Sequence, residues 1–196
     1  MWRWLVWQWQ WPAAAIFTAI FLLALAPLVN ETEIDFLTII YLQLPIYLIH
    51  QAEEHLHDRF RNHINHQIGH GAELLTRPAT FLINFIGVWV YDITAILLAS
   101  RHSIPAGLAC GYLSFVNGII HLVSAIKDRQ SNPGLISAIF LLIPFGAYCV
   151  MQVGAEASPA DHLAGVAPAL LVHFFIIAYV VFRLKKACGR NNIGNY

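Results

Sequence analysis

Residues 104–126 read IPAGLACGYLSFVNGIIHLVSAI and contain no charged side chain. About 20 apolar residues are enough for a helix to cross the hydrocarbon core of a bilayer, so this stretch predicts a transmembrane helix. Gly107, Gly111 and Gly118 would give the helix a stripe of small residues against which another helix can pack closely. Asn117 and His121 interrupt the apolar character, and their spacing of four places both side chains on one helix face.

Five other stretches are also long enough to cross a bilayer. They cover residues 11–29, 34–57, 79–100, 133–153 and 163–184, and the second is apolar only as far as Ile49. Asn132 and Pro133 predict the N-cap and the first helical position of the helix over 133–153. Short connections between consecutive stretches favour antiparallel neighbours. The expected fold is therefore an all-α helical bundle with six transmembrane helices, organised as a single integral membrane domain over residues 1–196.

The composition excludes several other classes of protein. Hydrophobic residues make up 58% of the chain and charged residues only 11%, whereas about 25% of the residues in soluble domains are charged. A chain of this size has too little interior to hide so much apolar surface from water, which excludes a soluble globular protein, a disordered chain and a nucleic-acid binder. The three cysteines show no CxxC spacing, so neither a disulfide framework nor a zinc knuckle is indicated.

The charges of the loops predict the orientation of the bundle. With six spans, both termini lie on one side of the membrane, and that side carries every lysine and arginine except Arg101. Loops rich in Lys and Arg stay in the cytoplasm, so we expect both termini to be cytoplasmic. Alternating tryptophans near the N-terminus predict an aromatic belt at the membrane surface; they are Trp2, Trp4, Trp7, Trp9 and Trp11.

Ionisable side chains inside the predicted spans are functional candidates, because they are costly in a bilayer unless they are paired or hydrated. His50, Glu53, Glu54 and His57 recur at spacings of three and four residues, so they share one helix face. At a rise of about 1.5 Å per residue, polar residues of four spans fall in the cytoplasmic half of the bilayer. These residues are His50, Glu53, Glu54, Asn84, Asn117, His121 and His173. Asp92 lies nearer the far side. The common depth predicts one buried site.

The residue types of this site suit two kinds of chemistry. Imidazoles and carboxylates bind transition metals, so the expected ligands for Zn, Fe or Mn are His50, Glu53, Glu54, His121 and His173. Adjacent glutamates in a low-dielectric site cannot both ionise easily, so Glu53 and Glu54 would also supply a general acid and a general base. Asn117 would orient His121 or the substrate. The expected catalytic residues are therefore Glu53, Glu54 and Asn117.

Each of these residues also has a simpler structural explanation. The two glutamates would suit the polar end of a helix at the water interface, and His121 and His173 would suit hydrogen bonds within or between helices. The shared depth favours a common site over these separate explanations. Further histidines lie at the end of the second span and in the loop after it, and they would form either a second metal site or a solvated loop. They are His55, His57, His63, His66 and His70.

The order of these residues resembles a known family. Four features of the chain are similar to the HXXEE-domain family, over roughly residues 41–179. They are the string His50-Gln51-Ala52-Glu53-Glu54, the pair Asn117-x-x-x-His121, His173, and the string Asn132-Pro133-Gly134-Leu135. The resemblance implies a multi-pass protein of the bacterial inner membrane with a polar intramembrane site. It implies no particular reaction, because the function of the family is undefined.

Four functions from different classes are compatible with the sequence. The preferred one is a metal-dependent membrane enzyme, a hydrolase or an oxidoreductase, that acts on a lipid or another apolar small molecule. The second is a metal-free acid/base isomerase or cyclase of an isoprenoid or sterol-like lipid. The third is a proton or metal-ion transporter, for which Asp92 is the candidate group in the outer half of the bilayer. The fourth is a non-catalytic membrane partner protein, which would leave the buried carboxylates without a role.

Overall fold

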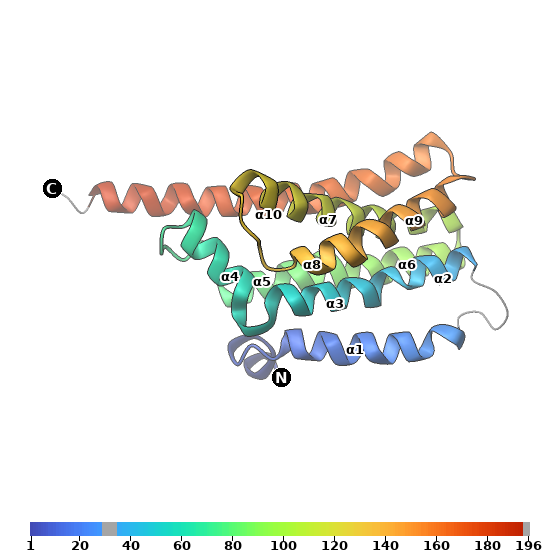
Figure 1. Ribbon diagram of the computed structural model, residues 1–196, viewed down its shortest axis with the longest axis horizontal. Coiled ribbons are helices and arrows are strands. Elements are labelled where there is room, and N and C mark those ends of the chain that lie inside the picture. Colours follow the sequence, from blue (N-terminus) through green and yellow to red (C-terminus); the bar gives the residue numbers. More distant parts are fainter. Residues whose placement is uncertain (29–34, 194–196) are drawn as a thin grey trace.

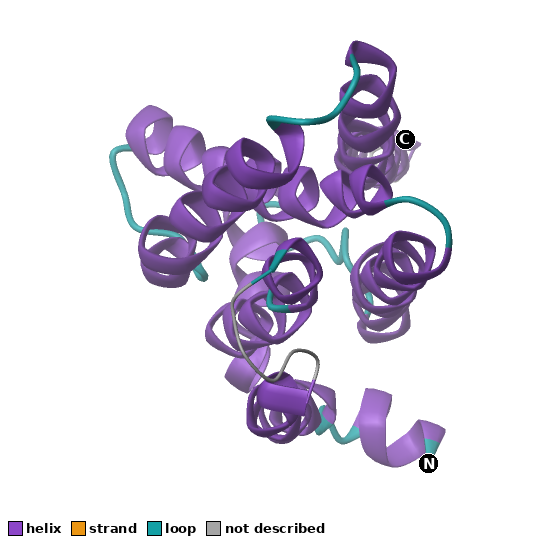
Figure 2. Ribbon diagram, turned by 90° about the vertical axis from the view of Figure 1, so that its right-hand side faces the viewer, coloured by secondary structure: helices purple, strands orange, loops and turns teal. Residues whose placement is uncertain are grey.

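The computed structural model describes residues 1–28 and 35–193, and these residues contain helices and no strand (Figures 1 and 2). The longer helices are α1 (Trp11–Leu25), α3 (Gln43–His55), α6 (Tyr91–Arg101), α7 (Leu108–Asp128), α9 (Ile143–Gly154) and α10 (Pro159–Ile193). The shorter α-helices are α2 (Phe36–Tyr41), α4 (Arg59–His63), α5 (Arg77–Asn84) and α8 (Leu135–Ser137). Short π- or 3-10-helical segments join them: η1 (Arg3–Trp7), η2 (Ala26–Leu28), η3 (Leu56–Asp58), η4 (Ile64–Ile68), η5 (Phe85–Val90), η6 (Ile104–Gly107) and η7 (Ala138–Leu142).

Within residues 1–28 and 35–193, five continuous helical stretches are long and apolar enough to cross a membrane. They are Trp11–Leu28, Arg77–Arg101, Ile104–Asp128, Leu135–Gly154 and Pro159–Gly189, and they correspond to five of the six predicted spans. The prediction of a helical bundle of membrane-spanning helices is thus confirmed to this extent. The remaining predicted span, 34–57, forms α2 and α3 with a break at Leu42 and is not among the five. Val29 and Ile34, the predicted ends of the first two spans, lie outside the described residues.

Helix α3 is less apolar than the five spanning stretches, and it lies inside the bundle. Of its 13 residues, all but Ile49 and Glu53 are buried. Ala15 and Ala19 of α1 pack against Leu44 and Leu48 of α3, and Figure 1 shows α1 running beside α3 at one edge of the molecule. Polar side chains on a helix surrounded by other helices can contact protein instead of lipid. This position explains why α3 carries histidine and glutamate side chains.

Gly111 and Gly118 of the predicted glycine stripe lie where α7 packs closely against α9, whereas Gly107 lies against Ile40 of α2. A Cβ atom at Gly111 would lie 2.9 Å from Cys149 Sγ, and a Cβ atom at Gly118 would lie 2.7 Å from Ile143 Cγ1. Only a residue without a side chain allows this approach. The close contact also sets the position of Asn117 and His121, which share α7 with the two glycines.

The N-terminal tryptophans fall into two groups. Trp2, Trp4 and Trp7 are about half exposed, as an aromatic belt requires. Trp9 and Trp11 differ from that prediction, because the Trp9 indole N–H donates a hydrogen bond to His55 O at 2.8 Å and Trp11 is completely buried with its ring 4.7 Å from the His55 ring. These two side chains hold the N-terminal segment against the end of α3.

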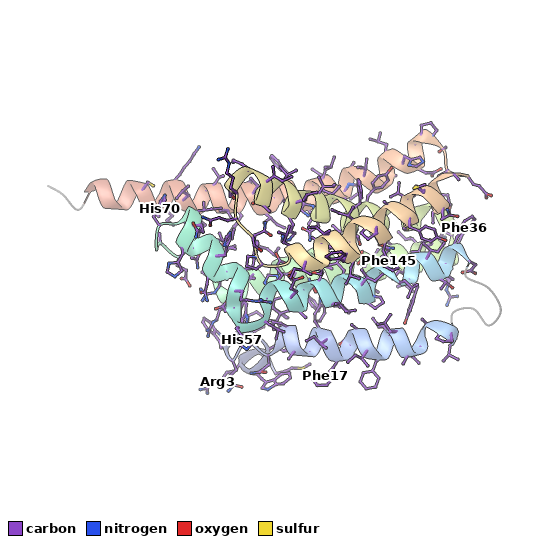
Figure 3. The ribbon with its side chains drawn as sticks, viewed as in Figure 1. Arg3, Phe17, Phe36, His57, His70 and Phe145 are labelled. Carbon is purple, nitrogen blue, oxygen red and sulfur yellow. The ribbon has the colours of Figure 1, made fainter. Side chains whose placement is uncertain are left out.

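The outer surface of the bundle is apolar between two more polar ends. Phe17 of α1 is 65% exposed and points away from the other helices in Figure 3, as a lipid-facing side chain would. Figure 3 also places Arg3, His57 and His70 toward one end of the long axis and Phe36 at the other. The N-terminal segment and the end of α10 lie toward the same end as Arg3, His57 and His70 (Figure 1).

Asp92 of α6 is completely buried, and neither of its carboxylate oxygens has a hydrogen-bond partner among the described residues. A buried polar group without a partner costs free energy. We therefore expect Asp92→Ala to leave the midpoint of thermal unfolding in detergent unchanged or higher. The control is Asp35→Ala, which removes the N-cap hydrogen bond to Thr38 N and should cost about 1 kcal/mol. A clear loss of stability in Asp92→Ala would contradict this expectation.

Candidate functional site

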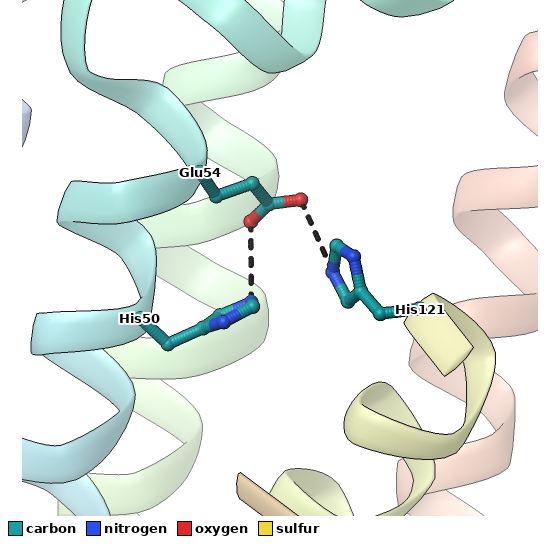
Figure 4. A group of neighbouring side chains, drawn as sticks. All are labelled: His50, Glu54 and His121. Carbon is teal, nitrogen blue, oxygen red and sulfur yellow. Dashed lines mark ion pairs between the residues drawn. The ribbon is translucent and has the colours of Figure 1, made fainter. Parts of the chain in front are cut away.

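Three of the predicted ligands come together at the centre of the bundle. His50 and Glu54 belong to α3 and His121 belongs to α7, and all three side chains are buried (Figure 4). Glu54 Oε2 lies 3.6 Å from His50 Nε2, and Glu54 Oε1 lies 3.5 Å from His121 Nε2. One ligand atom from each residue lies within 4.8 Å of the others, so the cluster could hold a metal ion.

Helix periodicity explains why these side chains meet. His50 and Glu54 are four residues apart on α3, and Asn117 and His121 are four residues apart on α7, so each pair lies on one helix face. The Asn117 side-chain amide spans the gap between the helices, with Nδ2 3.0 Å from His50 Nε2. The predicted convergence of these spans at one depth is therefore seen in the side-chain contacts.

The segment between α7 and α8 determines which nitrogen of His121 carries the proton. The Asn132 amide donates from Nδ2 to His121 O at 2.9 Å, which turns Asn132 Oδ1 toward His121 Nδ1 at 2.7 Å. His121 Nδ1–H must then be the donor, because Asn132 Oδ1 can only accept. In the neutral imidazole, Nε2 consequently directs a lone pair toward the Glu54 carboxylate.

The spacing of the three side chains suits a metal ion. Two ligand atoms that each lie about 2.0–2.1 Å from a tetrahedral ion are about 3.3–3.4 Å apart. The observed separations are 3.5 and 3.6 Å, but they involve different oxygens of the Glu54 carboxylate. One ligand atom from each residue lies within 4.8 Å of the others, so the three side chains would close in slightly to reach tetrahedral spacing. The second ring nitrogen of His50 has a polar partner, as is usual for metal-binding histidines, since Nδ1 lies 2.9 Å from Ser137 Oγ. Such outer partners fix the ring orientation of metal-binding histidines.

Glu54 has a further contact that the sequence did not assign. His55 Nε2 lies 3.0 Å from Glu54 Oε2, so the carboxylate is surrounded by the imidazoles of three histidines. His55 is buried, although the sequence analysis predicted that it belongs with the histidines of the following loop. Its assignment to that loop was wrong because α3 continues to His55 and the Trp11 ring covers it.

The structure places Glu53 and His173 beside the cluster and not within it. The Glu53 carboxylate accepts hydrogen bonds from the backbone N–H groups of Ile136 and Ser137, at 3.2 and 2.6 Å, and thereby anchors the start of α8. His173 of α10 contacts Asn117 Oδ1 at 3.1 Å. Their roles as metal ligands remain predictions.

Asn132, Ser137 and Gly134 are contacts of the cluster that sequence reasoning missed. The predicted N-cap at Asn132 is wrong, because α8 begins only at Leu135 and the Asn132 side chain bonds to His121 instead. Gly134 takes the left-handed conformation, with φ of +92°, directly against the imidazoles of His50 and His121. The signal that could have identified this segment is the string Asn132-Pro133-Gly134-Leu135 itself.

The remaining predicted polar residues lie apart from the three ligands. Gln51 bonds to Asn84 at 2.8 Å and accepts from the Trp89 indole at 2.6 Å, which ties α3 to α5 and η5. Of the loop histidines, His66 and His70 are exposed and His63 is half-buried. Burial lowers the pKa of the His63 imidazole, which favours its neutral form near pH 7.

A cavity of about 650 Å³ adjoins the candidate metal site. Glu54, Asn117, His121 and His173 line one part of it, and apolar side chains of α10 line another. A space of this size is typical of a site for a small-molecule ligand. The cluster is therefore accessible to a ligand even though its own side chains are buried.

Asn132→Ala is expected to lower the metal affinity of the cluster by about 10–100-fold, because the variant loses the partner that orients His121. Lys127→Ala is the control, since Lys127 is an exposed residue near the end of α7 that does not line the cavity. Metal affinity can be measured by competition with a chelator of known affinity. Equal affinities of the two variants would contradict the orienting role of Asn132.

Comparison with known proteins identifies a family but no function. A family model described as "Protein of unknown function with HXXEE motif" matches residues 41–149, which is more than half of the chain. No curated protein and no solved structure matches the chain.

Proposed function

The chain belongs to the HXXEE family, and we propose that it is a membrane-embedded, metal-dependent enzyme that acts on a lipid or another apolar substrate. His50, Glu54 and His121 would bind the metal, and the adjoining cavity would hold the substrate. Glu53 and His173 would act from beside the metal centre.

The observation that carries this proposal is the arrangement of His121 and Glu54. Because Nδ1 of His121 donates to Asn132, its Nε2 lone pair and a Glu54 oxygen face each other at 3.5 Å. Two acceptors that face each other repel unless a metal ion or a proton lies between them. A divalent ion bound by both residues would supply that cation. His50 would join as a third ligand once its Nε2 is released from the Asn117 amide, which lies 3.0 Å away.

The donor set suits several metals. Two imidazoles and one carboxylate bind zinc in hydrolases and non-haem iron in oxygenases, in each case with open positions left for water or substrate. When bound, such a metal would polarise a substrate oxygen or lower the pKa of a bound water. Asn117 lines the cavity beside His50, so its amide would position the polar group of the substrate.

Elemental mass spectrometry of the protein, purified in mild detergent, tests metal binding. We expect near-stoichiometric Zn, Fe or Mn. The metal-loaded protein is then incubated with a membrane lipid extract, and the lipids are compared by mass spectrometry with those treated by Glu54→Gln. A lipid species consumed only by the wild-type protein would support the enzyme. Protein that stays metal-free after growth with each metal would contradict the proposal.

A metal-free acid/base enzyme is the second candidate, because a proton on His121 Nε2 would also separate the two acceptors. Glu54 would then take part in proton transfer with the surrounding histidines, of which His55 is the nearest at 3.0 Å. Lipid conversion that survives complete metal removal by a chelator would favour this candidate.

We also propose that α2 and α3 together form a sixth crossing, with both termini in the cytoplasm. The helix interior can tolerate the polar residues of α3 because other helices surround it. A fluorescent protein that folds only in the cytoplasm tests the topology. It is expected to fluoresce when fused after residue 196 and to stay dark when fused after His102, and fluorescence of the His102 fusion would contradict the proposed topology.

A further inference from the structure

The cavity beside the candidate metal site has one polar side and one apolar side. Glu54, Asn117, His121 and His173 line the polar side. Val172, Ile176, Ile177 and Val180 line the apolar side, and all four belong to α10. We propose that this cavity binds a single-chain lipid, with its polar headgroup toward His121 and its hydrocarbon chain along α10. The assignment rests on the proposed function, because it names the substrate class of that same site.

The apolar wall reaches the outer surface of the bundle. Ile177 lines the cavity and is nevertheless 55% exposed, and Ile120 of α7 lines the cavity and is 36% exposed. In a bilayer, exposed apolar side chains of membrane-spanning helices contact lipid chains. A lipid can therefore reach the cavity from within the bilayer, beside α7 and α10, without passing through water.

The polar side offers a headgroup both donors and acceptors. Asn117 can donate or accept, and where the cavity reaches the loops Gln67 and Gln130 add uncharged amides and Asp128 adds a carboxylate. His63 also lines the cavity, and burial lowers the pKa of its imidazole, which favours the neutral form. These groups suit an alcohol, acid or ester headgroup better than an apolar molecule such as a hydrocarbon.

The size of the cavity favours one chain. Its volume of about 650 Å³ lies inside the range of about 300–1,000 Å³ for sites that enclose a small ligand. One hydrocarbon chain and a small headgroup fill such a space. A lipid with two chains would leave its second chain outside, so that chain would add little to the binding.

Spin-labelled stearic acid tests the assignment in phosphatidylcholine vesicles that contain the full-length, metal-loaded protein. Electron paramagnetic resonance measures the fraction of label that the protein immobilises. We expect Ile177→Trp and Ile176→Phe to weaken binding of the label by about tenfold, because the larger side chains fill the cavity. Leu171→Trp is the matched control, because Leu171 is an exposed residue of α10 that does not line the cavity; it should bind as the wild type does.

The outcomes separate this assignment from the proposed function. Metal content is measured in every sample and should be the same in all four proteins. Lipid binding by wild type and control, with loss in either cavity variant, supports the assignment even if the protein holds no metal. The assignment fails if the wild-type protein does not immobilise stearic acid, whether or not it holds metal. It also fails if both cavity variants bind like Leu171→Trp, or if spin-labelled phosphatidylcholine binds as tightly as stearic acid.

Discussion

Glu54→Gln is expected to remove the bound metal from the purified protein, whereas Glu53→Gln is expected to retain it. The two residues are neighbours on α3 and receive the same chemical change. Glu54 faces His50 and His121 at 3.6 and 3.5 Å, so the amide would replace a charged ligand with a weak neutral one. The loss should exceed the roughly 10–100-fold reduction that follows the loss of an outer partner of a metal site.

Glu53→Gln should show a different defect. Its carboxylate accepts from the N–H groups of Ile136 and Ser137. Glutamine keeps one oxygen acceptor and loses the charge, so we expect a loss of about 1 kcal/mol in the free energy of unfolding. Metal content should stay near that of the wild type.

Elemental analysis and thermal unfolding of both variants provide the measurement. Glu54→Gln must elute as a folded protein in size-exclusion chromatography for its metal loss to count. Metal loss from Glu53→Gln to the same extent would show that both carboxylates bind the ion. Metal loss from both variants would support the prediction from the sequence that Glu53 and Glu54 are both ligands. Metal retention by Glu54→Gln would contradict the candidate site.

The apolar spans and the depth of the polar residues could be predicted from the sequence because both depend on spacing along one helix. Transfer free energy decides which stretches cross the bilayer, and the rise per residue gives the depth of each side chain. His50, Asn117, His121 and His173 therefore meet at one level, as expected. The span 34–57 is not apolar enough to be recognised as a spanning helix, because other helices, and not lipid, surround α3.

The choice between Glu53 and Glu54 could not be predicted from the sequence. Each lies one helical turn from His50, at spacings of three and four residues. Only the positions of α7 and α8 decide that Glu54 meets His121 while Glu53 meets the backbone of Ile136 and Ser137. Depth alone likewise placed His173 in the cluster, although Asn117 lies between it and His50.

The misassigned N-cap at Asn132 has a similar cause. Asn before Pro is a strong local signal for the start of a helix. A buried histidine nearby offers the same side chain a stronger interaction, since His121 Nδ1–H needs an acceptor and Asn132 supplies one. A tertiary contact therefore overrides the local preference, and the helix starts two residues after Pro133.

Gly134→Ala is expected to lower metal affinity at least tenfold, whereas Gly71→Ala should leave it unchanged. Both glycines have φ of +92°, so alanine is strained at either position by about 1 kcal/mol. The surroundings differ. A Cβ atom at Gly71 would meet nothing within 4 Å, but one at Gly134 would lie 2.8 Å from His50 Cε1 and 3.0 Å from His121 Cε1.

The added methyl group acts on both candidate ligands at once. Cε1 lies between the two nitrogens of each ring, so a displaced Cε1 moves Nε2 away from Glu54. Ligand positions need to be held within about 0.5 Å for a working site. Chelator competition and thermal unfolding separate the two effects, because Gly71→Ala reports the backbone strain alone. If Gly134→Ala shows only the stability loss of Gly71→Ala and wild-type metal affinity, the two imidazoles do not bind the metal from the positions that they occupy beneath Gly134.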